Sequence, residues 1–334
     1  MPVQQLVALI FSKKEMERTI IRLKLDFAKI PIYSIDRDTL TAAYKILNDV
    51  HELIQANCST SKFDGPTQAL LLDLTNRFYS KIHHCFNGLE KPRILDNLEI
   101  VKEKNEILDN LFEIILARDV LKEKLRPSET AKEDKTSPID NCYTTLSTNL
   151  EIIDSESPDH ARILQYFMDS QSPIHNFCLK MGHMFRVVRR DERERFLPFQ
   201  NFNNRRLLWH GSRTSNIAGI LMHGLKASPS GAENSTWNRG IYFADVSTKS
   251  AWYCRVASSS EVGILLLCEV ALGNMNEITR NTTFPEKLPE EYNSIKVIGK
   301  YQSPDVTGLM IDGVQIPLGT PQKMKQDADM EHNE

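Results

Sequence analysis

The stretch Asn203-Asn-Arg-Arg-Leu-Leu-Trp-His-Gly-Ser-Arg-Thr-Ser-Asn216 decides how the second half of this chain folds. Its run 206–209 has the composition of a β-strand and ends in a His-Gly pair. Glycine has no Cβ, so a ligand can closely approach the backbone N–H and C=O of Gly211. A carboxamide carries the complementary acceptor and donor. The stretch therefore predicts a strand end that suits a planar amide ligand.

A second segment, Arg239-Gly-Ile-Tyr-Phe-Ala-Asp245, has the same strand-like texture and places the ring of Tyr242 near its end. A helix is expected directly after it, at 247–254. Ser250 and Tyr253 are three residues apart there, which places them on one helical face. One hydroxyl and one aromatic ring can therefore address the same ligand.

The remainder of the second half shows the same alternation. Short apolar runs broken by Gly, Pro, Asn and Asp are typical of strands. Strands are expected at 150–153, 183–188, 206–209, 240–243, 263–270 and 308–311, and helices at 159–171, 215–222 and 247–254. This order predicts an α+β domain with a mainly antiparallel sheet.

The first half has a helical apolar period. Ser12-Lys-Lys-Glu15 is a capping box that predicts a helix start. Apolar residues then recur every three or four positions from Asp38, from Leu70 and from Asn97, which predicts an all-α bundle. The polar stretch 126–137 indicates a linker. We therefore expect a helical domain at 1–125, a linker at 126–137 and an α+β domain at 138–334.

The composition is that of an ordinary globular protein: 41 Lys+Arg against 44 Asp+Glu give a net charge of −3, with 25% charged residues. This balance gives no overall electrostatic signature for nucleic acid. Six cysteines without a CxxC pair favour reduced thiols over disulfides or zinc. No apolar run approaches the roughly 20 residues of a membrane span. We expect a soluble intracellular protein with no metal and no membrane partner.

Three weaker motifs do not carry a function. Gly219-x4-Gly224-Leu-Lys226 has its lysine displaced by one residue from a phosphate-binding P-loop and lacks the following Ser or Thr. His83-His84-Cys85 would point to different faces of a helix, so it is a poor metal site. The arginines at 186–195 alternate with acidic residues, which is typical of a self-compensated, solvated hairpin.

Six blocks of the second half occur in a fixed order, and they are Leu207-Leu-Trp-His-Gly-Ser-Arg213, Gly219-Ile-Leu with Gly224-Leu, Gly240-Ile-Tyr-Phe-Ala-Asp245, Lys249-Ser-Ala-Trp-Tyr-Cys254, Glu269-Val-Ala-Leu-Gly273 and Asp312-Gly-Val-Gln-Ile-Pro-Leu-Gly319. In these blocks the chain resembles the catalytic domain of the poly(ADP-ribose) polymerases, which are diphtheria-toxin-like ADP-ribosyltransferases. Asn76-Arg-Phe-Tyr79 and Leu108-Asp-Asn-Leu111 resemble the helical regulatory domain of the DNA-dependent members. The resemblance covers about residues 2–334.

The resemblance implies that NAD⁺ is the substrate and that no metal is used. It implies that His210 holds the adenosine ribose, that the backbone of Gly211 holds the nicotinamide amide, and that Tyr242 and Tyr253 stack on the pyridinium ring. The other residues of the NAD⁺ site that it implies are Ser212, Asn216 on the adenosine side, Lys249 near the acceptor, and Ser250 on the amide.

The resemblance also implies the catalytic carboxylate. Asn333-Glu334 match the family's pair that opens a late strand, and Glu334 completes a catalytic set with His210, Tyr242 and Lys249. Loss of nicotinamide builds oxocarbenium-like charge on the ribose, which a carboxylate stabilises. Because Glu334 is the last residue, we expect a domain truncated before its last strands. The chain is then an incomplete version of a longer enzyme or a variant that binds NAD⁺ without efficient transfer.

The sequence thus predicts a transferase that moves ADP-ribose from NAD⁺ to protein acceptors, itself included, and acts in the DNA damage response. Nuclear localisation is expected by resemblance. DNA would act only indirectly or through a module absent from this chain, and the helical domain would be an autoinhibitory cap. Two alternatives stay open: a weakly active or inactive NAD⁺-binding module, and a purely structural helical scaffold.

Overall fold

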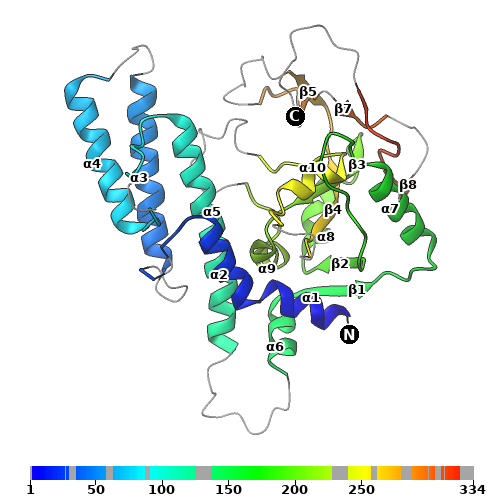
Figure 1. Cartoon of the computed structure of the whole chain (residues 1–334). Helices are drawn as coiled ribbons and strands as arrows, with labels where there is room; N and C mark the ends of the chain where they lie inside the picture. Colours follow the sequence, from blue (N-terminus) through cyan, green and yellow to red (C-terminus); the bar gives the residue numbers. More distant parts are fainter. Residues whose placement is uncertain are drawn as a thin grey trace. The chain divides into compact units, whose positions relative to one another are not determined.

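The computed structural model describes residues 2–26, 28–29, 35–57, 63–86, 91–124, 137–227, 240–256, 262–279, 288–299, 301–304, 310–311 and 313–323. The contacts divide the chain into two compact units (Figure 1). The helical unit comprises Gln4–Leu146 and Ser215–Ile241. The mixed unit comprises Met1–Val3, Ser147–Thr214 and Tyr242–Glu334.

The helices of the first half begin where the sequence offers caps. Their bounds are α1 (Pro2–Ile10), α2 (Lys13–Arg22), α3 (Arg37–Ala56), α4 (Gly65–Lys81), α5 (Leu98–Lys124) and α6 (Pro138–Thr145). The side chains of Ser12, Asp36 and Asp64 each accept a hydrogen bond from a backbone N–H of the first turn of α2, α3 and α4. The helices expected from the capping box and from the three apolar stripes are confirmed.

The core of the helical unit lies between α3, α4 and α5, and α3 packs against the other two. Val50, Phe78, Leu108 and Leu111 are fully buried there, as the apolar stripes predict. Leu70 is an exception because 47% of it is exposed.

The mixed unit is built from short strands and helices. Its strands are β1 (Thr148–Ile152), β2 (Phe185–Arg189), β3 (Arg205–Gly211), β4 (Leu265–Ala271), β5 (Met275–Ile278), β6 (Ser294–Val297), β7 (Tyr301–Gln302), β8 (Met310–Ile311), β9 (Val314–Gln315) and β10 (Gln322–Lys323). Its helices are α7 (Pro158–Asp169), α8 (Glu192–Phe196), a 3₁₀ turn (Leu197–Phe199) and α10 (Ser247–Trp252). α9 (Thr214–His223) follows β3 and lies almost entirely in the helical unit.

Among the described residues, four small sheets hold the mixed unit together. The largest has the order β4-β3-β9-β8, and β1-β2, β10-β7 and β5-β6 form pairs. β3 and β4 are antiparallel over seven residue pairs from Arg205↔Ala271 to Gly211↔Leu265. The expected class, an all-α region followed by an α+β region with a split sheet, is confirmed. The β3–β9 and β5–β6 pairs are parallel, so the sheets are not uniformly antiparallel.

Two local predictions were wrong. The segment 240–243 does not form a strand, because among the described residues its pairing with β3 is limited to an isolated bridge at Ala244. The arginines at 186–195 lie on β2, on the turn after it and on α8 instead of on a hairpin, and Arg189 forms an ion pair with Glu192 at 2.7 Å.

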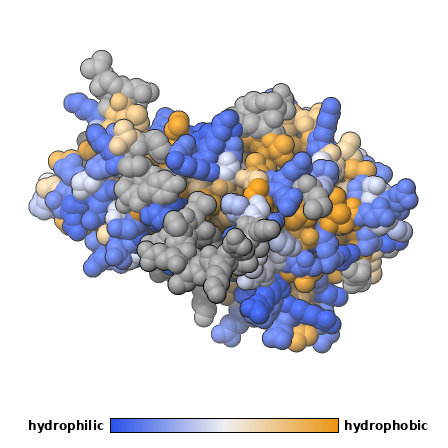
Figure 2. Space-filling model, turned by 90° about the horizontal axis from the view of Figure 1, so that it is seen from below, coloured by the Kyte–Doolittle hydropathy of each residue, from blue (hydrophilic) through white to orange (hydrophobic). Residues whose placement is uncertain are grey.

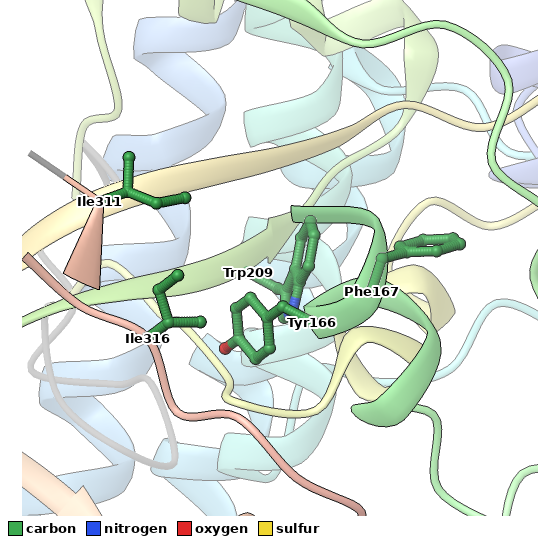
Figure 3. Close-up of a cluster of buried hydrophobic side chains, with 5 residues drawn as sticks. All are labelled: Tyr166, Phe167, Trp209, Ile311 and Ile316. Carbon is green, nitrogen blue, oxygen red and sulfur yellow. The ribbon is translucent and has the colours of Figure 1, made fainter. Parts of the chain in front are cut away.

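An aromatic cluster forms the core of the mixed unit (Figure 3). The rings of Tyr166 and Phe167 on α7 lie 5.0 and 5.8 Å from the ring of Trp209 on β3. Ile311 and Ile316 close the cluster from the segment that carries β8 and β9. Aromatic contacts at these distances contribute roughly 0.5–1.5 kcal/mol each beyond area burial, so α7 is fixed against β3.

The surface mixes hydrophilic and hydrophobic side chains, as the space-filling view of one face shows (Figure 2). Within the described ranges, no helix combines the length and hydrophobicity needed to cross a bilayer.

Helix α9 packs against two helices of the first half within the helical unit. Thr19 on α2 donates to the Ser215 hydroxyl at 3.3 Å, and Asn216 donates to the Asn110 side chain on α5 at 3.2 Å. A Cβ at Gly219 would lie 1.8 Å from Oε2 of Glu113, so the carboxyl group occupies the space that a larger residue would need.

The side chain of Glu113 is a buried carboxyl group in this contact, and ionising it there is unfavourable. Its Oε2 is buried and has no hydrogen-bond partner among the described residues. Burial raises the pKa of Glu113 to about 7; Lys226 opposes this shift and Asp109 adds to it. The folded protein therefore holds a proton that the unfolded chain releases near the ordinary glutamate pKa of 4.5. This residue makes folding less favourable as pH rises from about 4.5 to 7.

We expect Glu113→Gln, an isostere of the protonated side chain, to raise the free energy of unfolding by about 1–2 kcal/mol at pH 8. The variant should also flatten the loss of stability between pH 4.5 and 7. Urea unfolding at several pH values measures both effects. Glu106→Gln, at an exposed position of α5, is the matched control and should change little. A less stable Glu113→Gln protein at pH 8 would contradict this reading.

Candidate functional site

The edge of β3 that faces away from β4 is the frame of the candidate site. Trp209 exchanges two backbone hydrogen bonds with Ala244 across this edge, at 2.8 and 2.9 Å. Backbone groups alternate between the two edges of a strand, so Leu207 and Gly211 present their N–H and C=O to the same edge as Trp209. We call this the outer edge of β3. It has three successive rungs, at residues 207, 209 and 211, and β9 pairs with the start of this edge at Arg206↔Gln315.

The third rung, at Gly211, lies against α10. A Cβ on Gly211 would be 1.7 Å from the backbone oxygen of Ser250, so glycine is required for this approach. The Ser250 side chain is 4% exposed, and its hydroxyl donates to the Trp209 carbonyl at 2.9 Å. Because the hydroxyl proton is used in this bond, the oxygen keeps its acceptor capacity toward a ligand.

His210 is held by the segment opposite β3. Its Nδ1 lies 2.8 Å from the backbone oxygen of Tyr242, and a ring nitrogen bonds a carbonyl only when it carries a proton. Burial lowers the pKa of His210, and the bond to Tyr242 opposes that shift. The neutral ring therefore has its proton on Nδ1 and a lone pair on Nε2, which is an acceptor for a hydroxyl group.

Two aromatic rings near this edge present large exposed surfaces. Tyr242 is 50% exposed and Tyr253 is 53% exposed. Tyr253 caps the C-terminus of α10, and the guanidinium carbon of Arg255 lies 5.9 Å from its ring centroid. The site thus combines a backbone amide edge, a buried hydroxyl, an imidazole acceptor and two exposed rings.

The other residues expected at the site have varied positions. Ser212 follows β3 directly, and Lys249 lies on α10, one residue before Ser250. Asn216 lies on α9 in the helical unit, where it donates to Asn110. Glu334 lies outside the described residues, as does its neighbour Asn333. In the part of the chain that is described, no three His, Cys, Asp or Glu side chains are grouped as metal ligands.

Sequence reasoning did not single out two residues that shape the outer edge. The Tyr166 hydroxyl lies 3.2 Å from the Leu207 oxygen and 3.3 Å from the Asp245 oxygen. The Asp245 carboxylate accepts a hydrogen bond from the backbone of Ser303 at 2.9 Å. A tyrosine on the apolar face of the helix expected at 159–171 was the available signal, because a buried phenol needs an acceptor.

We expect Gly211→Ala to lower the free energy of unfolding by about 1–3 kcal/mol, because the new methyl group meets a backbone oxygen that cannot turn away. Thermal unfolding measures the loss. Gly182→Ala is the control in the same unit, since a Cβ there meets nothing within 4 Å. Equal stability of the two variants would contradict the close contact of β3 with α10.

Comparison with known proteins places this geometry in a family. Residues 157–334 match the poly(ADP-ribose) polymerase catalytic domain, and residues 1–161 match the poly(ADP-ribose) polymerase regulatory domain. The chain is 38% identical over 322 residues to poly [ADP-ribose] polymerase 1 of Gallus gallus and 33% identical over 320 residues to poly [ADP-ribose] polymerase 2 of Homo sapiens. Each alignment covers 95% of this chain, but only 30% of the chicken protein and 52% of the human one.

The catalytic-domain match covers more than half of the chain and contains the outer edge of β3, His210 and α10. The chain belongs to the poly(ADP-ribose) polymerase family and carries regulatory and catalytic domains of that family.

Proposed function

We propose that this chain is an NAD⁺ ADP-ribosyltransferase that transfers ADP-ribose to protein acceptors, itself included, and releases nicotinamide. The observation that carries the proposal is the third rung of the outer edge of β3. There Gly211 presents a backbone donor and acceptor beside the buried Ser250 hydroxyl. The match to the family's catalytic domain supports the same reading.

The nicotinamide half of NAD⁺ is assigned to this rung. The N–H of Gly211 donates to the amide oxygen, and its C=O accepts one amide hydrogen. The Ser250 oxygen, whose own proton goes to Trp209, accepts the second amide hydrogen. The rings of Tyr242 and Tyr253 stack on the cationic pyridinium ring, which aromatic faces attract. Ser212 completes this part of the proposed site.

The ribose half is assigned to His210, whose Nε2 accepts a hydrogen bond from a ribose hydroxyl. Asn216 is assigned to the adenosine side. As nicotinamide leaves with the electron pair of the glycosidic bond, positive charge develops on the ribose. The Glu334 carboxylate is proposed to stabilise that charge and to polarise the incoming nucleophile. Lys249 is proposed to lie near the acceptor. The substrate needs no redox partner because nicotinamide is already a good leaving group.

The wider setting is proposed from the family resemblance. We propose the boundaries expected from the sequence for the functional domains, with a helical domain at 1–125, a linker at 126–137 and a catalytic domain at 138–334; the compact units differ from them, since Ser215–Ile241 belongs to the helical unit. The helical domain is proposed to limit NAD⁺ entry until it opens locally. Nuclear localisation and a role in the DNA damage response are proposed on the same basis, with DNA acting indirectly.

The direct test is incubation with NAD⁺ labelled in its ADP-ribose half, followed by measurement of self-labelling and of nicotinamide release. We expect both from the wild type, and about a hundredfold slower transfer from Glu334→Gln with NAD⁺ binding retained. Glu331→Gln is the matched control and should keep full activity. Binding of NAD⁺ without any transfer would favour an NAD⁺-binding module, and no binding at all would remove the proposal.

A second test uses the protonation state of His210. Because its pKa is lowered, we expect NAD⁺ affinity to be constant from pH 8 to 6.5 and to fall only at lower pH, when protonation removes the Nε2 acceptor. Calorimetric titration at each pH measures this. Benzamide, which lacks the ribose, serves as the control ligand, and its affinity should not change with the protonation state of His210. NAD⁺ affinity that rises as the pH falls would contradict the assigned role.

A further inference from the structure

We infer that Tyr166 is a positioning residue of the carboxamide site, whose hydroxyl holds the outer edge of β3 and the segment 242–245 at the spacing that the ligand needs. The inference rests on the proposed function, because it assigns the ligand's amide to Gly211. Tyr166 does not itself contact that amide.

The hydroxyl of Tyr166 supplies a hydrogen-bond donor to two backbone carbonyls that lie close together. The carbonyl oxygens of Leu207 and Asp245 converge on it, at 3.2 and 3.3 Å, and two acceptors cannot bond one another. Tyr166 is fully buried. Burial raises the pKa of Tyr166 well above its usual value, so the group keeps the proton that the two carbonyls share. Without that donor, the part-buried Leu207 carbonyl would lose this hydrogen bond and the Asp245 carbonyl would keep the longer one from the Ser303 hydroxyl, at 3.5 Å, so the loss is costly.

The Tyr166 hydroxyl bonds residues near the Trp209–Ala244 backbone pair, which precedes the proposed site at Gly211. Trp209↔Ala244 is an antiparallel bridge, so the same register continued along β3 places Gly211 opposite Tyr242. Within the described ranges, β3 and segment 242–245 are joined by a single backbone pair, Trp209↔Ala244. β3 is fixed by its pairing with β4 and β9, whereas one backbone pair does not by itself fix the orientation of segment 242–245. The Tyr166 hydroxyl connects β3 to segment 242–245 on one side of the Trp209–Ala244 pair. The hydrogen bond from His210 to Tyr242 connects them on the other side.

Helix α7 provides a rigid base for Tyr166. The ring packs 5.0 Å from the Trp209 ring within the cluster of Figure 3. The end of α7 also holds the start of α10, because the Ser247 hydroxyl donates to the Phe167 oxygen at 3.1 Å and the Ser247 N–H donates to the Ser170 oxygen at 3.0 Å. One helix therefore sets the positions of β3, of segment 242–245 and of the helix that carries Ser250.

The test compares two ligands on Tyr166→Phe. Benzamide carries the carboxamide that Gly211 is proposed to bind, whereas ADP-ribose lacks it. We expect benzamide to bind about fivefold to tenfold more weakly to the variant, the equivalent of roughly 1–1.4 kcal/mol, while ADP-ribose affinity changes by less than about twofold. Tyr79→Phe is the control, since its hydroxyl also bonds a backbone oxygen at 3.2 Å, that of Arg93 in the helical unit. It should leave both affinities unchanged.

Unchanged benzamide affinity in Tyr166→Phe, or an equal loss for both ligands, would overturn the inference, because a purely structural tyrosine gives one of these results. A wild-type protein that binds neither benzamide nor NAD⁺ would instead overturn the proposed function. Hydrogen exchange in the wild type provides a test without the variant. We expect the Ala244 N–H, which donates to Trp209, to be protected before any ligand is added. Protection that appears only with benzamide would show that the ligand, not Tyr166, orders this edge.

Discussion

The close approach of Gly211 to the backbone of Ser250 is the constraint on which the rest of the mixed unit depends. It brings a strand end and a helix together with no side chain between them, and among the described residues no other backbone pairs with Gly211 on the outer edge. Of the three rungs on the outer edge, the first accepts the Tyr166 hydroxyl and the second pairs with Ala244. The third is the rung that we assign to the nicotinamide amide. We therefore propose that the carboxamide of the ligand pairs with the backbone of β3 at this rung.

The groups that we assign to the nicotinamide and the ribose at this edge are mostly uncharged. They are backbone amides, the Ser250 hydroxyl, a neutral imidazole and two rings, all of which suit a neutral amide and a ribose hydroxyl, and the charged side chains of Lys249 and Arg255 lie nearby in the sequence of α10 and its end. In the proposed reaction, NAD⁺ itself carries the leaving group. Helix α9, most of which lies in the helical unit, begins three residues after Gly211 in the sequence. Contacts of Ser215, Asn216 and Gly219 hold that helix against α2 and α5.

Local signals in the sequence predicted most of the fold. Caps such as Ser12 and helical apolar stripes depend on neighbouring residues, and those helices are confirmed. The segment 240–243 was predicted as a strand because its composition is strand-like, but pairing depends on the partner edge, where the Tyr242 carbonyl binds the His210 ring instead. Tyr166 was missed for the same reason: its role is set by two carbonyls distant in sequence. The roles of Gly211 and Ser250 were proposed from residue chemistry and family resemblance, and Glu334 lies outside the described residues.

The central claim is that the backbone of Gly211 binds a carboxamide. The most direct measurement is the amide resonance of Gly211 in isotopically labelled protein during a titration with benzamide. We expect a large, saturable shift at Gly211, with a much smaller one at Leu208, whose backbone groups face β4. Saturable binding of benzamide that leaves the Gly211 resonance in place would contradict the claim.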